Sequence, residues 1–253
     1  MSVKTKFDMY LAPPSRAAFA ALADWMHAAM AGVTDGQDPV KGTTGDFVVG
    51  QVCGITLATA PPGRFHYLAT PVMDDDAVPA GHYNSLIIAP REGGIDQLAE
   101  FDPARHRAVI NEPGSFSGAI TFTAHLRKAV GHELITPLLS GGHLASVAMV
   151  AAGRAQLAAI DRVSFALAGA TRPGDVAAVQ VIDETAFYPG LPFVADGALP
   201  SDAVARLRDR LLDFRSHPAW REMAEILRLR DLTILDAADY DIMATIGMPR
   251  PGS

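Results

Sequence analysis

The sequence has few cysteines, no long apolar stretch and no excess of positive charge, which are features that mark several classes of protein. Cys53 is the only cysteine among 253 residues, so an internal disulfide and a cysteine-based zinc cluster are excluded, and the redox compartment stays undetermined. No stretch approaches the ~20 apolar residues that a membrane-spanning helix needs. The formal net charge of −7 argues against nucleic acid or an anionic membrane surface as a partner.

Catalytic and cofactor motifs are missing as well. The sequence has no GxSxG nucleophile turn, no P-loop and no GxGxxG dinucleotide fingerprint, and its eight histidines form no HxxH or HxxxH pair. The acidic run Asp74–Asp76 lacks the surrounding spacing of an EF-hand and is typical of a solvated turn. The sequence therefore predicts no catalytic residue, no metal site and no cofactor.

Two strand–loop–helix units in direct succession, followed by a third strand, occupy the segment from Arg107 to Asp161. We predict strands at 107–111, 135–139 and 157–160 and helices at 119–130 and 144–152. Such spacing implies parallel strands, so both loops meet at the sheet edge where open α/β sheets bind ligands. Helix starts there offer free N–H groups and a positive dipole end, which predicts a site for a small, partly anionic molecule.

The first of these helix starts carries Ser115, Phe116, Ser117 and Gly118. The two hydroxyls and nearby main-chain N–H groups can converge on one oxyanion. The alternative is that one serine simply caps the helix, as serines often do. Phe116 is either a pocket wall or a core residue, because the sequence does not show where its side chain points.

The loop before the second helix runs from Ser140 to His143. The glycine pair between them lets the backbone approach a ligand closely. His143 can donate a hydrogen bond to an anion, although a lone histidine is more often structural. Asp161 ends the third strand at the same edge, where it can pair with a ligand ammonium, cap the next helix, or form a salt bridge to Arg162 or Arg154.

Further polar residues are weaker candidates for ligand contact. Glu184 is a second candidate for the role of Asp161. Polar edges near the expected cleft or hinge come from Tyr10, Gln51, Cys53 and Tyr83. Cys53 paired with a distant histidine can in principle act as a nucleophile, but a buried and inert cysteine is the commoner situation.

Segments of this kind, in this order, resemble the phosphate/phosphonate-type substrate-binding proteins of ABC importers, the PhnD-like family. The matching segments are 51–54 (QVCG), 67–72 (YLATPV), 111–118 (NEPGSFSG), 140–146 (SGGHLAS), 150–161 (VAAGRAQLAAID) and 189–193 (PGLPF). The resemblance implies an α/β, two-lobed type II periplasmic-binding-protein fold with its ligand in the cleft, no enzymatic activity, and a membrane permease as partner. One departure is Phe116, where the family usually has a hydroxyl.

The lobes expected from this reading are discontinuous. Residues 1–82 with 184–253 form one lobe and residues 83–183 the other, with crossings near Tyr83 and Asp183 as the hinge. Residues 1–6 are polar and show no secretory leader, so the protein is periplasmic if a leader was removed and otherwise cytoplasmic. A cytoplasmic enzyme or a ligand-sensing module of the same fold stays open as an alternative.

The expected ligand follows from the charges of the two loops. Between Ser115 and Gly118, and between Ser140 and His143, there is no Lys or Arg, so hydroxyls, N–H groups and His143 hold the negative group. Asp161 or Glu184 then complements a cation at the far end. We therefore expect a small zwitterion or an organic anion with an apolar portion rather than inorganic phosphate.

Overall fold

The computed structural model describes residues 4–31 and 47–246, which fall into two compact units. The first unit holds the described residues up to His82 together with Pro189–Ala244, and the second holds Tyr83–Tyr188 and the described chain end from Thr245. The chain passes from one unit to the other in β4 (His82–Tyr83) and β10 (Tyr188–Pro189), which pair as a two-stranded sheet. The second crossing, which the sequence predicts near Asp183, is found later, between Tyr188 and Pro189. The reason is that β9 (Val179–Glu184) is still a strand of the second unit.

The first unit is built on a mixed sheet of five strands. In spatial order these are β1 (Thr5–Lys6), β2 (Val49–Gln51), β11 (Phe193–Asp196), β3 (Phe65–Met73) and β12 (Leu229–Thr233). β1 and β2 are parallel, whereas β11 is antiparallel to β2 and β3, and β12 is antiparallel to β3. β11 therefore brings a segment from late in the chain between two early strands.

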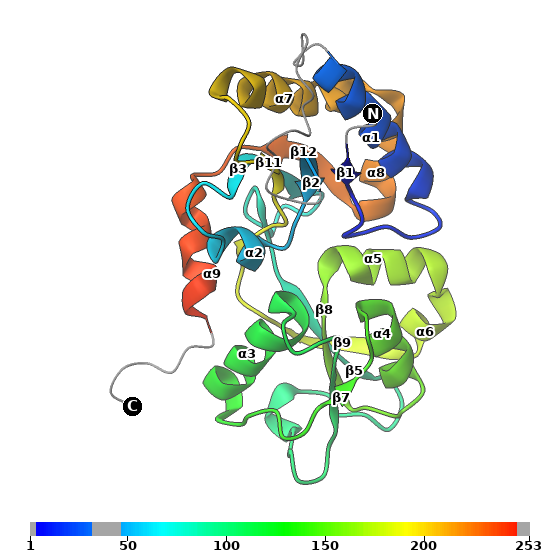
Figure 1. Ribbon diagram of the computed structural model, residues 1–253. Coiled ribbons are helices and arrows are strands. Elements are labelled where there is room, and N and C mark those ends of the chain that lie inside the picture. The colour runs from blue at the N-terminus through cyan, green and yellow to red at the C-terminus, as the bar shows by residue number, and fades with distance from the viewer. Residues whose placement is uncertain (1–3, 32–46, 247–253) are drawn as a thin grey trace. The chain divides into compact units, whose positions relative to one another are not determined.

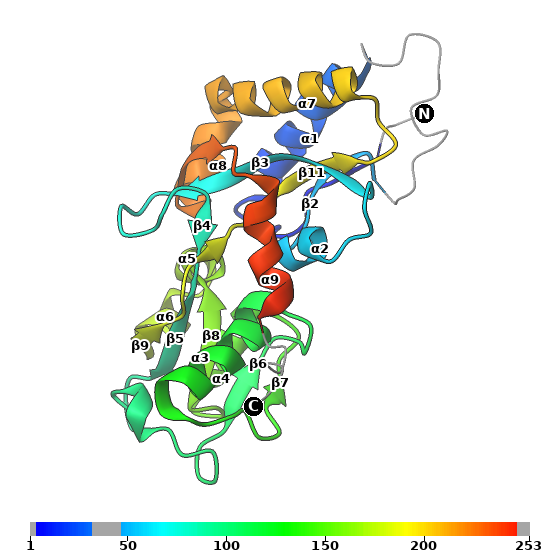
Figure 2. The same ribbon diagram turned by 90° about the vertical axis from the view of Figure 1, so that its left-hand side faces the viewer.

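Helices lie on both faces of this first sheet. In Figures 1 and 2, α1 (Arg16–Ala31), α7 (Ser201–Asp213) and α8 (Pro218–Leu227) lie on one face. On the other face are α2 (Gly54–Ala58), η4 (Ala237–Tyr240) and α9 (Asp241–Thr245), while η3 (Phe214–Ser216) links α7 to α8. The apolar residues of α7 recur at a spacing of three and four, and Val204, Leu207 and Leu211 are accordingly buried.

The boundary between α8 and β12 is sharp, because α8 ends at Leu227. Arg228 takes a left-handed conformation with φ 54° and ends α8, so that Leu229 begins β12.

The second unit contains the predicted parallel strands. Its sheet has the order β7 (Leu138–Leu139), β6 (Ala108–Ile110), β8 (Leu157–Asp161), β5 (Ser85–Pro90) and β9. β6 is parallel to both β7 and β8, which confirms the prediction for the segment 107–161, and β5 is antiparallel to β8 and β9. Its helices are η1 (Leu98–Glu100), η2 (Phe116–Ile120), α3 (Thr121–Val130), α4 (His143–Ala151), α5 (Arg162–Thr171) and α6 (Pro173–Ala177).

Both faces of this second sheet carry helices, and its central strands β5, β6 and β8 are buried along their whole length. On β5, Ile87 and Ala89 pack into a cluster with α3 and η1, while Leu86 and Ile88 pack on the opposite face against α4 and its neighbours. Gly131, with φ 71°, ends α3 where the sequence predicts it. The resulting three layers hold the loops after β6 and β7 at one edge of the sheet.

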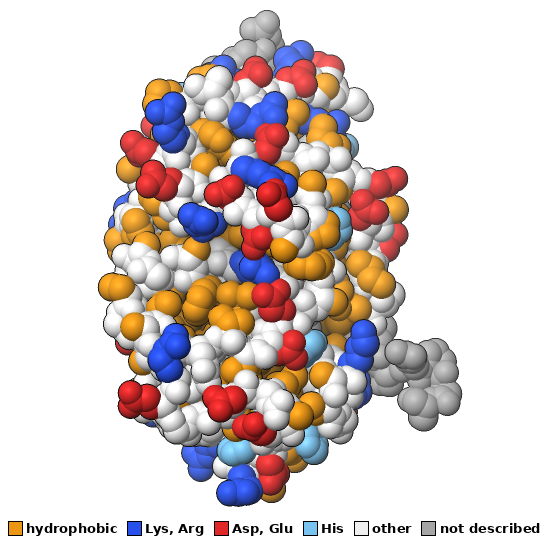
Figure 3. Space-filling model, turned by 180° about the vertical axis from the view of Figure 1, so that it is seen from behind, with side chains coloured by type: hydrophobic (Ala, Val, Ile, Leu, Met, Phe, Trp, Pro, Cys, Tyr) orange, Lys and Arg blue, Asp and Glu red, His pale blue; other side chains and the backbone are white. Residues whose placement is uncertain are grey.

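The surface shown in Figure 3 mixes acidic and basic side chains and leaves hydrophobic side chains scattered among them. None of the helices that the structure describes combines the length and the apolarity needed to cross a bilayer. Among the same residues, no group of three or more His, Cys, Asp or Glu side chains is arranged to hold a metal ion.

Candidate functional site

The loops after β6 and β7 are joined to each other through the backbone. Ser140 N–H donates to the carbonyl of Ile110 at 3.0 Å, and Gly141 N–H donates to the carbonyl of Asn111 at 2.9 Å. These bonds hold the loop before α4 against the end of β6. The N-termini of η2 and α4 are therefore neighbours within the second unit, as the parallel strands require.

The first helix start is a π-helical turn that continues into α3. Ser115 precedes the turn, and its Oγ accepts a hydrogen bond from Gly118 N–H at 3.1 Å, so this serine does cap the helix. Within the described ranges no acceptor is found for the N–H groups of Phe116 and Ser117. Turns of this type often occur at functional sites, and two unpaired N–H groups at a helix start favour an anion.

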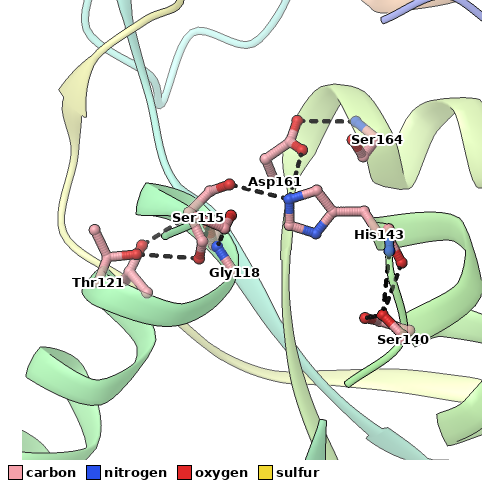
Figure 4. Close-up of polar contacts among 12 residues, drawn as sticks. Ser115, Gly118, Thr121, Ser140, His143, Asp161 and Ser164 are labelled. Carbon is pink, nitrogen blue, oxygen red and sulfur yellow. Dashed lines mark hydrogen bonds and ion pairs between the residues drawn. The ribbon is translucent and has the colours of Figure 1, made fainter. Parts of the chain in front are cut away.

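His143 reaches from the start of α4 to this turn (Figure 4). Its Nε2 lies 3.0 Å from Ser117 Oγ and 3.2 Å from Asp161 Oδ2. The side chains of His143 and Asp161 are only 11% and 4% exposed. Burial lowers the pKa of His143, and this outweighs the nearby Asp161, the Ala159 carbonyl and Glu112, which all raise it. The ring is therefore neutral at pH 7.

The placement of the two oxygens fixes the tautomer of this ring. Asp161 Oδ2 faces Nε2, and a carboxylate requires a proton on the nitrogen beside it, so Nε2 carries the hydrogen. With its hydrogen on Nε2, the ring donates to Ser117 Oγ at 3.0 Å, while Asp161 Oδ2 lies beside the same nitrogen at 3.2 Å as an electrostatic partner. The hydroxyl hydrogen of Ser117 is then available to another acceptor, such as a ligand oxygen.

This arrangement differs from a catalytic triad, although it contains a serine, a histidine and an aspartate. In a triad the carboxylate and the hydroxyl contact opposite ring nitrogens, so that the base can take the proton of the serine. Here Ser117 and Asp161 contact the same nitrogen of His143. The Nε2–H group cannot act as a base toward the Ser117 hydroxyl, and the geometry suits binding rather than nucleophilic attack.

Gly118 and Asn111 complete the contact between the two helix starts. A Cβ on Gly118 would collide with Asn111 Oδ1, and it would lie 2.8 Å from Asn111 Cγ and 3.0 Å from His143 Cε1. Asn111 Oδ1 is buried and has no hydrogen-bond partner among the residues that the structure describes. Sequence reasoning missed Asn111, although it follows β6 directly, in the kind of position that Asp161 occupies on β8.

Two residues predicted at the site are engaged in their own surroundings. Ser140 Oγ contacts Ser146 Oγ at 2.7 Å, the carbonyl of Gly142 at 3.0 Å and the carbonyl of Ile110 at 3.3 Å, so its hydroxyl stabilises the loop before α4. Phe116 is 1% exposed and meets the ring of Tyr188 edge-on at 5.1 Å. Phe116 is therefore a core residue rather than a pocket wall.

The two acidic candidates already have partners. Asp161 Oδ1 accepts from Ser164 N–H at 2.9 Å and caps α5, one of the alternatives left open by the sequence. Glu184 forms an ion pair of 2.6 Å with Arg162 and accepts from Asn84 Nδ2 at 3.0 Å. Asn84 was not predicted at this edge, because its place depends on the antiparallel strand β5.

The remaining candidates lie elsewhere. Gln51 is buried in β2 of the first unit, where its Nε2 donates to the Leu191 carbonyl at 3.2 Å and its Oε1 has no partner among the described residues. Cys53 precedes α2, and Tyr10 is buried in the same unit. Tyr83 is buried in β4. The cluster of Ser117, His143 and Asp161 thus belongs to the second unit alone.

Comparisons with known proteins agree with this architecture. A solved binding-protein component of an ABC phosphonate transporter from Pseudomonas aeruginosa is similar, with a TM-score of 0.70 and 17% identity over 94% of this chain and 82% of that one. PhnD1 from Prochlorococcus marinus in complex with methylphosphonate gives a TM-score of 0.65 and 13% identity over 91% and 82% of the two chains. XAC2383 from Xanthomonas citri bound to ATP gives 0.67 and 15% over 97% and 99%.

These likenesses confirm the periplasmic-binding-protein fold predicted from the sequence. A comparison with curated protein sequences gives no match. The family model described as "ABC transporter, phosphonate, periplasmic substrate-binding protein" matches residues 55–240, well over half of the chain. That family consists of substrate-binding proteins of transporters, which are not a class of enzymes. The chain belongs to the phosphonate-type periplasmic substrate-binding proteins of ABC transporters.

Proposed function

We propose that this protein captures a small oxyanion of the phosphonyl or phosphoryl kind in the periplasm and delivers it to an ABC permease. The single observation that carries the ligand class is the meeting of two helix N-termini at which Ser117 Oγ lies 3.0 Å from His143 Nε2. Ser117 then offers both its hydroxyl hydrogen and its main-chain N–H. The two helix dipoles add positive potential at the same place.

The neutral donor set favours a compact anion. Neither loop carries an Arg or Lys, and Arg162, which follows Asp161, is paired with Glu184. Hydroxyls and N–H groups arranged in this way suit the oxygens around one central atom. The similar structures solved with methylphosphonate and with ATP hold ligands that share a tetrahedral phosphorus–oxygen group. Since Asp161 and Glu184 have partners of their own, a ligand ammonium is not required.

Titration calorimetry with methylphosphonate tests this proposal. A hydrogen bond to a charged group contributes about 1.5–3 kcal/mol, so Ser117→Ala should weaken binding by about tenfold or more. Thr123→Val is a matched control, because Thr123 lies on the same helix and its hydroxyl only donates to the Ala119 carbonyl at 2.8 Å. Equal affinity in wild type and Ser117→Ala would show that the anion is held elsewhere.

A thermal-shift series gives an independent reading. Methylphosphonate at about 100 times its Kd should stabilise the fold by ~2.7 kcal/mol. The absence of any shift with methylphosphonate, phosphate or larger phosphonates would argue against the whole ligand class.

A further inference from the structure

Two buried hydroxyls from different elements donate to one carbonyl of the first helix start. Ser85 Oγ on β5 donates to the carbonyl of Ser117 at 3.0 Å, and Thr121 Oγ1 at the start of α3 donates to the same carbonyl at 3.1 Å. Ser85 is 1% exposed and Thr121 is 2% exposed. A bond from a threonine to the carbonyl four residues earlier is common in helices, whereas the bond from Ser85 joins two elements that are distant in the sequence.

The backbone around Ser85 fixes the place of its hydroxyl. Ser85 N–H donates to Thr185 Oγ1 at 2.9 Å, and the Ser85 carbonyl accepts from Thr185 N–H at 2.9 Å. Both residues are buried. β5 pairs with β8 on one side and with β9 on the other, so Ser85 belongs to the interior of the sheet and its hydroxyl is a donor in a fixed position.

The carbonyl that receives these two bonds shares a peptide group with the N–H of Gly118. That N–H donates to Ser115 Oγ at 3.1 Å (Figure 4). Hydrogen bonds in a chain polarise one another, so donors to the carbonyl strengthen the N–H as a donor, and the N–H strengthens the Ser115 hydroxyl in turn. Within the described ranges, no acceptor is found for the Ser115 hydroxyl hydrogen, which can therefore be donated to a ligand oxygen.

We propose that Ser85 and Thr121 are positioning residues of the anion site. They act through the peptide group between Ser117 and Gly118, whose N–H strengthens the Ser115 hydroxyl as a donor to the ligand. This inference rests on the proposed function. Neither Ser85 nor Thr121 touches the ligand, and both side chains are neutral. The site thereby gains stronger donors for an anion without a basic side chain in either loop.

Titration calorimetry with methylphosphonate tests this link in a double-mutant cycle of wild type, Ser85→Ala, Ser115→Ala and the variant with both changes. Ser85→Ala should weaken binding by about three- to tenfold when Ser115 is present, and by less than about twofold when it is already alanine. A residue that only supports the loop would weaken binding by the same factor in both backgrounds. Equal factors, or no loss in Ser85→Ala, overturn the inference and leave the proposed function intact.

Thr121 offers a matched pair of variants. Thr121→Val removes the hydroxyl at nearly constant shape and should weaken methylphosphonate binding by about two- to fivefold, whereas Thr121→Ser keeps the hydroxyl and should keep the wild-type affinity. Thr123→Val is the control on the same helix, because that hydroxyl donates only to the Ala119 carbonyl, and its affinity should be unchanged. An equal loss in Thr121→Ser and Thr121→Val would assign the effect to the methyl group and contradict the inference.

A measurement without ligand separates the inference from the proposed function. The amide proton of Gly118 resonates at lower field when its hydrogen bond is stronger. In the ligand-free protein this resonance should therefore move to higher field in Ser85→Ala and in Thr121→Val, and stay in place in Thr123→Val. An unchanged resonance in the first two variants overturns the inference, also when Ser115→Ala abolishes binding and the cycle cannot be completed. A moved resonance in a protein that binds no methylphosphonate overturns the proposed function and leaves the link from Ser85 to Gly118 in place.

Discussion

In the loop after β6, Ser117 Oγ lies 3.0 Å from His143, whereas in the loop after β7, Ser140 Oγ turns back to its own loop and to Ser146. Both serines precede or begin a helix at the same sheet edge. The difference follows from the order of the strands. β6 lies between β7 and β8, so the loop after β6 has neighbours on two sides, while β7 is an edge strand. The loop after β7 must satisfy more of its polar groups internally.

The glycines of the two loops differ in how much space surrounds them. A Cβ at Gly118 would collide with Asn111, whereas a Cβ at Gly142 meets no atom within 4 Å. The start of η2 is thus closed in by side chains, and the start of α4 is open. A side chain therefore has no room at Gly118 but has room at Gly142, and the sequence alone does not distinguish the two positions.

The largest effect is expected from Gly118→Ala. The added methyl displaces Asn111 and the His143 ring, so methylphosphonate binding should be lost and the free energy of unfolding should fall by about 1–3 kcal/mol. Calorimetry and denaturant unfolding measure the two quantities. Gly114→Ala is the control, because its Cβ would meet nothing within 4 Å in the same segment. Normal binding in Gly118→Ala would show that the contact between the two helix starts is unimportant.

A smaller effect is expected from Ser140→Ala, which should reduce the stability of the fold rather than the affinity for the ligand. Removing this hydroxyl takes the partner from Ser146 Oγ and one of two donors from the Gly142 carbonyl, which still accepts from Ser146 N–H at 2.9 Å, so the free energy of unfolding should fall by about 1–2 kcal/mol. Methylphosphonate affinity measured by calorimetry should change by less than about threefold, because this hydroxyl is not directed to the ligand site. A tenfold loss of affinity without a loss of stability would assign Ser140 to ligand contact instead.

Local patterns sufficed to predict much of the second unit. The segment 107–161 alternates strands and helices at short spacing, and both the parallel pairing and the helix stop at Gly131 are confirmed. The roles of its serine hydroxyls were harder to predict, because helix capping and ligand contact use the same residue types at a helix start. The direction of Phe116 depends on Tyr188, which is far away in sequence.

The first unit was less predictable because its sheet is assembled from distant segments. β11 has only four residues, all buried, and lies between β2 and β3, so no local alternation reveals it. β12 contains Arg230 and Asp231, which lower the strand propensity of the segment, and it forms by pairing with β3. For the same reason, the network of Glu184, Arg162 and Asn84 could not be seen before the antiparallel register of β5 was known.

The last prediction concerns the one side chain that connects the two loops. Burial lowers the pKa of His143, so the unfolded chain takes up a proton at a higher pH than the folded protein does. The stability associated with the neutral ring is therefore complete above pH ~6.5, the ordinary value for histidine, and declines as the pH falls below it. The decline cannot exceed about 1.4 kcal/mol per pH unit for one proton.

Urea unfolding between pH 5 and pH 7.5 measures this slope, and His143→Gln should make it shallower because that variant has no ring to protonate. Other histidines and carboxylates contribute to the slope in both proteins, so only the difference between the two curves reports on His143. Ser117→Ala keeps the buried ring and its contact with Asp161, and should therefore keep the wild-type slope. Parallel curves for wild type and His143→Gln would mean that His143 titrates alike in the folded and unfolded chain, and the buried link between the two loops would then have to be open to water.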